Sequence, residues 1–174
     1  MSYSYEVHGL DHLERKCRDK RVFDPLRDFF SRVTIAVQSK ARIHAPVDTG
    51  HLRSSIQAEI DGHTPPLWGK VGFMHASAGS PLWLKARAME YGTGRKGDKA
   101  VSHKASHFPP SESLDLWAKR HGLPSGYIVA RAIARRGGLK PRKFLRTGLA
   151  ESKQTIRSYL AQLGRDIRAA WDRK

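Results

Sequence analysis

The chain has 174 residues, of which 39% are hydrophobic and 28% are charged, proportions that suit one soluble domain with a packed core. Lys and Arg number 32 against 16 Asp and Glu, so the net charge is +16 and the expected partners are nucleic acid, acidic protein surfaces or anionic membranes. No apolar run approaches the roughly 20 residues that span a bilayer, and the first residues lack a secretory pattern. Cys17 is the only cysteine, which excludes an intrachain disulfide and a four-cysteine zinc site.

The first part of the chain predicts two helices. Apolar residues at helical spacing indicate a short amphipathic helix over residues 11–20, and we expect residues 1–22 to form an arm ending in this helix. A longer helix is predicted from Pro25 to about Ile43, with Asp24 as its N-cap and Pro25 as its first helical residue. Its apolar stripe predicts a helix that faces the core.

Residues 45–56, Ala-Pro-Val-Asp-Thr-Gly-His-Leu-Arg-Ser-Ser-Ile, mark a change from a helical period to the alternation of a strand. Pro46 prevents the helix from continuing, Asp48 can accept backbone hydrogen bonds in a turn, and Gly50 can adopt a positive φ. Leu52 and Ile56 are expected to fix the exit to the core. The whole predicted corner is formed by Pro46, Asp48, Thr49, Gly50, Leu52, Arg53 and Ile56.

The rest of the chain predicts a small sheet followed by helices. Two antiparallel strands are expected between residues 55 and 73, with a loop too long for a two-residue hairpin. The apolar spacing of residues 81–91 suits a helical turn. Residues 94–110 indicate a basic loop, and two helices are expected near 111–122 and 125–136. A last helix is predicted from Phe144 to about Trp171, in which Gly148 and Gly164 either kink the helix or allow another helix to come close.

Three segments carry a family resemblance: residues 45–56, then Ala88-Met89-Glu90-Tyr91-Gly92-Thr93, then Pro141-Arg142-Lys143-Phe144-Leu145. In this order, after a long helix, they resemble the signature of the tail-completion (head–tail joining) proteins of long-tailed double-stranded-DNA bacteriophages. The resemblance covers about residues 23–167. The matching positions of the second and third segments are Glu90, Gly92, Thr93, Pro141, Phe144 and Leu145.

The predicted elements, together with this resemblance, indicate an α+β fold: a small antiparallel sheet packed by the long helix of the N-terminal half and by the C-terminal helix. We expect one such domain over residues 23–174. Its link between the second and third segments is longer than in the compact form of the family, through a helical pair inserted at about 94–140. For residues 81–91, the resemblance implies a loop or short helix that enters a strand near 89–91, so this element stays open.

The resemblance also implies a function. Proteins of this family form a ring, commonly of six subunits, in the phage neck, where the ring completes the tail and joins it to the head connector while DNA passes through its lumen. The implied partners are other copies of the chain, neck or connector proteins, tail-tube or tail-terminator proteins, and transient non-specific contact with genomic DNA, without a membrane. The implied location is the virion, assembled in the host cytoplasm. We expect no catalytic residue, cofactor or metal.

Other chemistry fits the sequence less well. Gly92-Thr93-Gly94-Arg95-Lys96-Gly97 matches G-x-G-x-x-G but lacks the following helix of a dinucleotide site. His103 and His107 have metal-ligand spacing without helical support.

Asp48 and Glu90 are the best carboxylate candidates for catalysis. The alternative function is therefore a nucleic-acid-binding module or a metal-dependent nuclease acting outside the particle. Glu90 is also a candidate for a buried or interfacial ion pair, with Arg53 as its partner.

Basic residues are concentrated between Gly94 and Arg146, where thirteen Lys and Arg stand against three Asp and Glu. We expect this segment to face either an acidic connector or tail subunit, or the phosphates of DNA. The bases that flank a Gly137-Gly138 hinge are assigned to a subunit contact: Arg135, Arg136, Lys140, Arg142 and Lys143. The bases on a loop free to reach inward are assigned to the lumen: Arg95, Lys96 and Lys99.

Overall fold

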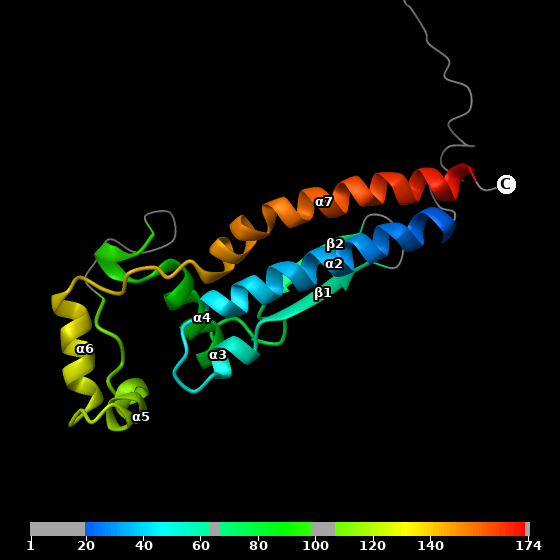
Figure 1. Cartoon of the computed structure of the whole chain (residues 1–174). Helices are drawn as coiled ribbons and strands as arrows, with labels where there is room; N and C mark the ends of the chain where they lie inside the picture. The colour runs from blue at the N-terminus through cyan, green and yellow to red at the C-terminus, as the bar shows by residue number, and fades with distance from the viewer. Residues whose placement is uncertain (1–19, 63–66, 99–106, 173–174) are drawn as a thin grey trace, which may run out of the picture.

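The computed structural model describes residues 20–62, 67–98 and 107–172. Two long helices dominate it, α2 (Lys20–His44) and α7 (Phe144–Asp172). They lie side by side in Figure 1, with the end of α2 beside the start of α7. Gly148 is what allows the close approach, because a Cβ at this position would lie 2.6 Å from the Ala41 nitrogen.

The start of α2 differs from the prediction. The helix begins at Lys20, so Asp24 is not its N-cap and Pro25 lies inside it. Proline has no backbone amide hydrogen to donate. Near the start of a helix, this leaves only one carbonyl without its intrahelical hydrogen bond, a loss that a helix as long as α2 tolerates. The boundary expected between residues 22 and 23 therefore falls within α2, and the short helix expected over 11–20 lies outside the described residues except for Lys20.

The sheet contains two antiparallel strands, β1 (Gln57–Asp61) and β2 (Trp68–Gly72). Ala58 pairs with Val71, and Ile60 pairs with Gly69. The sheet lies directly on α2, because a Cβ at Gly69 would be 2.7 Å from the Thr34 methyl group. This arrangement confirms the predicted α+β class, with the sheet packed on the long helix and that helix packed on α7.

The corner between α2 and β1 has its own short helix, α3 (His51–Ser54). The sequence predicted a turn here but not this short helix, because one helical turn is too short to leave an apolar period. Gly50 precedes α3 with a φ of +79°, as expected. Gln38 and Arg42 of α2 both donate to the Ile56 carbonyl, which fixes the start of β1.

Residues 81–91 form a regular helix, α4 (Pro81–Tyr91). The strand implied near Met89 is therefore wrong. The Ser80 hydroxyl accepts a hydrogen bond from the Trp83 amide, Pro81 stands in the first turn, and Gly92 follows the last residue, which together favour a helix of this length. A 3₁₀ turn, η1 (Gly94–Lys96), comes next.

The inserted pair consists of α5 (Glu112–Arg120) and α6 (Gly126–Arg135), close to the predicted bounds. Figure 1 shows this pair apart from the α2–α7 body, beyond the start of α7. The two helices are tied together because the Asp115 carboxylate accepts a hydrogen bond from the Gly126 amide at 2.6 Å.

All three motif segments contribute to one core cluster. Ala45 and Ile56 from the corner are buried with Ala41 of α2 and Phe144 at the start of α7. Val71, Phe73, Met89 and Leu145 pack around them, and Phe73 meets Phe144 edge to face at 6.1 Å between ring centroids. Among the described residues, no helix has both the length and the apolar character needed to cross a bilayer.

Candidate functional site

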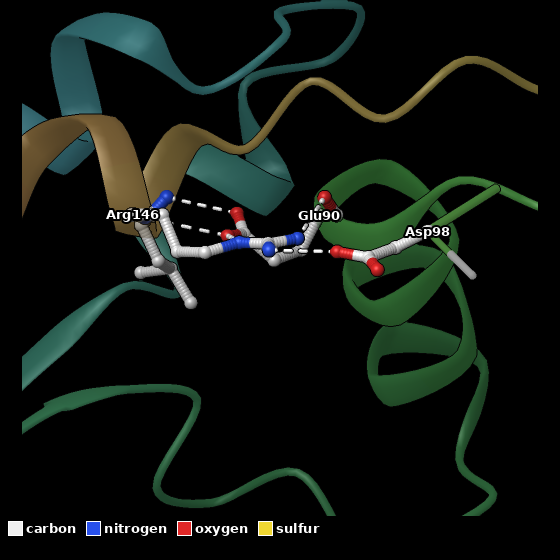
Figure 2. A network of polar contacts seen from close by, with 4 residues as sticks. Glu90, Asp98 and Arg146 are labelled. Atoms are coloured by element: carbon white, nitrogen blue, oxygen red, sulfur yellow. Dashed lines mark hydrogen bonds and ion pairs between the residues drawn. The ribbon is translucent and has the colours of Figure 1, made fainter. Parts of the chain in front are cut away.

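Glu90, near the end of α4, is a buried carboxylate that binds the first turn of α7 (Figure 2). The residue is 3% exposed, and its carboxylate accepts hydrogen bonds from the Leu145 amide at 2.9 Å and the Arg146 amide at 3.3 Å. These amides have no partner within the helix and carry a partial positive charge, so an anion there is stabilising. Glu90 therefore acts as a cap for α7 supplied by a distant part of the chain.

Arg146 completes this network. Its Nε donates to Glu90 at 3.1 Å, its Nη1 donates to Asp98 at 2.7 Å, and its guanidinium lies over the Tyr91 ring. The hydrogen bond to Asp98 is the main cause that raises the pKa of Arg146, Glu90 raises it further, and burial opposes both. A raised pKa adds stability that is lost only at strongly alkaline pH, so the contribution of the Arg146 charge is fully present at neutral pH.

The pairing of Glu90 with Arg53 is wrong. The Arg53 Nε instead donates to the Arg42 carbonyl at 2.7 Å and closes the end of α2. The one local hint that Arg146 has an acidic partner is its place in the first turn of a helix, where a cation is unfavourable unless an acid is near. Among the described residues, no buried side-chain polar atom is left without a partner.

Residues 92–94 cross residues 137–141 at very short range. The Thr93 amide donates to the Leu139 carbonyl, and the Leu139 amide donates to the Thr93 hydroxyl, both at 3.0 Å. A Cβ at Gly92 would lie 2.5 Å from the Leu139 oxygen, and one at Gly138 would lie 1.8 Å from the Thr93 oxygen. A Cβ at Gly94 would likewise lie 2.7 Å from the Gly137 oxygen, so the backbone crossing explains the first two glycines of the G-x-G-x-x-G pattern.

The crossing also changes the interpretation of Gly137 and Gly138. We expected them to form a hinge, but the Gly137 carbonyl accepts a hydrogen bond from the Lys96 amide at 3.2 Å and Gly138 is buried. Their positive φ angles, +78° and +111°, make a sharp turn that fits against residues 93–94. The pair is therefore a packed turn.

The second and third motif segments meet at what we call the motif junction, residues 90–94 together with residues 137–146. The Arg142 amide donates to the Met89 carbonyl at 2.8 Å, and the Lys143 amide donates to the Glu90 carbonyl at 3.3 Å. Pro141 lies against Gly92, and Phe144 then enters the core beside the corner. All six matching positions of these segments, Glu90, Gly92, Thr93, Pro141, Phe144 and Leu145, lie in the junction.

The corner residues divide into a buried and an exposed set. Leu52 is 3% exposed and Ile56 is fully buried, as predicted. Pro46 is half-buried where α2 ends, while Thr49 is exposed. Asp48 was expected to accept backbone hydrogen bonds in the turn. Its carboxylate instead forms an ion pair.

That ion pair joins Asp48 to Arg120 of α5 at 2.6 Å, which ties the corner to the inserted helical pair. Asp48 and Glu90 are thus bound by different arginines. Within the described ranges, no group of three or more His, Cys, Asp or Glu side chains could hold a metal ion. His103, the first of the two spaced histidines, lies outside those ranges, and His107 is half-buried.

The junction brings the two groups of bases together. The crossing places η1 against Gly137, and a Cβ at Gly137 would lie 3.7 Å from the Arg95 Cβ. All seven described bases of the two groups are exposed, and none forms an ion pair with an acid in the described part of the chain. We call this set the basic cluster: Arg95, Lys96, Arg135, Arg136, Lys140, Arg142 and Lys143. Lys99 lies outside the described residues.

Comparison with known proteins adds no assignment. No family model, curated protein or solved structure matches this chain. The motif junction and the basic cluster are therefore the observations from which a function can be inferred.

Proposed function

We propose that this chain is a structural virion protein of the tail-completion type, which completes a phage tail and joins it to the head. One observation supports this most: motif segments that are far apart in the sequence converge. Glu90 caps α7, Gly92 and Thr93 cross the segment before Pro141, and Phe144 packs with Ala45 and Ile56. Such convergence is expected if the three segments form one structural unit, as the resemblance implies.

The proposed role follows the family resemblance. The chain would form a ring of six copies at the head–tail junction, assembled in the host cytoplasm and carried in the virion. Its neighbours would be the connector or neck proteins and the tail-tube or tail-terminator proteins, and DNA would pass through the lumen. Such a protein acts by occupying a stoichiometric place, so no catalytic residue, cofactor or metal is proposed.

The geometry gives little support to the nuclease alternative. A metal-dependent nuclease needs carboxylates that converge and remain free to bind the ion. Glu90 is occupied by two amides and Arg146, and Asp48 is occupied by Arg120. The wild-type protein should therefore show no metal-dependent cleavage of DNA.

The proposal is tested by the composition of purified particles. Intact virions and tails detached from heads would be separated on density gradients and examined by quantitative mass spectrometry. We expect a fixed number of copies per virion. That number should equal the copy number of other proteins that form a six-fold ring in the same neck. Absence of the chain from purified virions would contradict the proposal and favour a protein that acts outside the particle.

A further inference from the structure

The basic cluster draws its seven exposed cations from two chain segments that are distant in the sequence. Arg95 and Lys96 belong to η1, and the other five belong to the end of α6 and the link to α7. The hydrogen bond from the Lys96 amide to the Gly137 carbonyl makes the two segments neighbours. Because like charges repel, a surface that gathers so many cations is expected to face an anion.

The backbone that carries these cations is held in place. The paired hydrogen bonds between Thr93 and Leu139 fix one side, and the contacts of Arg142 and Lys143 with the end of α4 fix the other. The junction carboxylates Glu90 and Asp98 are both bound by Arg146, so part of their negative charge is already offset. The cluster thus lies on two segments that backbone hydrogen bonds hold together.

We propose that the basic cluster binds the phosphates of double-stranded DNA without regard to base sequence. Four of its seven members are arginines, whose planar guanidinium groups can donate two parallel hydrogen bonds to one phosphate. Phosphate contacts of this kind position a protein on DNA and carry no base information. The binding is a property of the single chain, so it does not rest on the proposed place in the virion.

An acidic protein partner fits the cluster less well. Protein interfaces have apolar and aromatic anchors at their centre, whereas Leu139 and Pro141, the apolar residues between the cations of the link to α7, are half-buried in the junction. Large exposed apolar side chains of the inserted pair lie on other stretches: Leu116 on α5 and Tyr127 and Ile128 at the start of α6. The cluster is cationic without such anchors, which favours a phosphate backbone.

The test measures binding of the purified full-length chain to a short labelled duplex of mixed sequence over a range of salt concentrations. If all seven cations contact phosphates, the slope of log affinity against log salt is about −6. The triple variant Arg135→Gln, Arg136→Gln, Arg142→Gln should reduce the magnitude of that slope by about 2.7. The double variant Arg95→Gln, Lys96→Gln should reduce it by about 1.8.

A matched control separates this surface from the net charge of the chain. Lys153, Arg157 and Arg168 are exposed on α7, outside the junction. Their triple change to Gln removes the same charge as the cluster triple variant and should leave the slope close to that of the wild type. Circular dichroism of every variant confirms that each one folds, and a second duplex of different sequence should bind equally well.

Three outcomes would overturn the proposal. The control variant could reduce the salt-dependence slope as much as the cluster triple variant does, which would indicate that binding depends on the total charge of the chain and not on this surface. The Arg95 and Lys96 variant could retain the full slope, which would show that the two segments do not share a surface. Poly-glutamate could bind the wild-type chain as tightly as DNA does, which would assign the surface to an acidic protein. Failure of virion association alone would leave this DNA binding unchanged.

Discussion

At the scale of single residues, Glu90 is the side chain that links the second motif segment to the third. Glu90→Gln keeps the shape but removes the charge that the α7 amides and Arg146 require. We expect a loss of about 1.5–3 kcal/mol in the free energy of unfolding, the range for hydrogen bonds to charged groups. Denaturant unfolding of the purified protein measures this change.

The control for this prediction is Glu59→Gln, because Glu59 is exposed on β1. A surface change of this kind should stay within about 0.5 kcal/mol of the wild type. Equal stabilities for the two variants would show that the buried carboxylate does not stabilise the start of α7.

Gly50 offers a second test at this scale. Its φ is +79°, and a Cβ there would meet nothing within 4 Å, so a side chain would be opposed by backbone strain alone. Gly50→Val should cost at least about 1 kcal/mol, because a β-branched residue is strongly disfavoured at positive φ. Gly50→Asn should cost less, since asparagine tolerates this region. Unchanged melting temperatures for both variants would contradict the turn.

Residue roles were predictable from sequence where the cause is local. The proline, the positive-φ glycine and the buried Leu52 and Ile56 follow from turn chemistry and apolar alternation. The partner of Glu90 was not predictable, because Arg146 lies in another segment and its place in the first turn of α7 does not show which acid it meets. The same holds for Leu139, whose backbone completes the crossing.

At the scale of elements, the contact between α2 and α7 depends on one of two glycines in the same helix. A Cβ at Gly148 would lie 2.6 Å from the backbone of Ala41, whereas a Cβ at Gly164 would meet nothing within 4 Å. Gly148→Ala should force the helices apart at a cost of about 1–3 kcal/mol, typical of overpacking. Gly164→Ala should stabilise the protein by up to about 1 kcal/mol through helix propensity.

Thermal unfolding of the two alanine variants measures the difference directly, because the chemical change and the helix are identical. We expect the melting temperature to fall for Gly148→Ala and to rise for Gly164→Ala. A shift of the same sign and size in both variants would show that the close helix contact does not determine the outcome.

Element type was predictable where periodicity is long and ambiguous where it is short. The 29 residues of α7 gave a clear stripe, and the inserted pair was delimited by glycine and proline. The start of α2 was misplaced because a proline more often begins a helix than lies inside one. The four-residue α3 left no period, and α4 was ambiguous until its capping contacts were seen.

At the scale of the whole molecule, the α+β class could be predicted, but the convergence of the motif segments could not. Local pattern indicates which residues form helices and strands, whereas the crossing of residues 92–94 over 137–141 is a long-range contact across the inserted pair. That crossing also brings together two groups of bases that the sequence had suggested would face different partners.

The central claim is that this chain joins a tail to a head, and it is tested most directly by particles made without the protein. If the proposal holds, its coding sequence can be deleted from a phage genome, and the lysate examined by electron microscopy with and without complementation by the wild-type chain. The proposed function predicts DNA-filled or fillable heads and separate tails that fail to join, with joined particles restored by complementation. Normal, infectious, fully joined particles in its absence would contradict it.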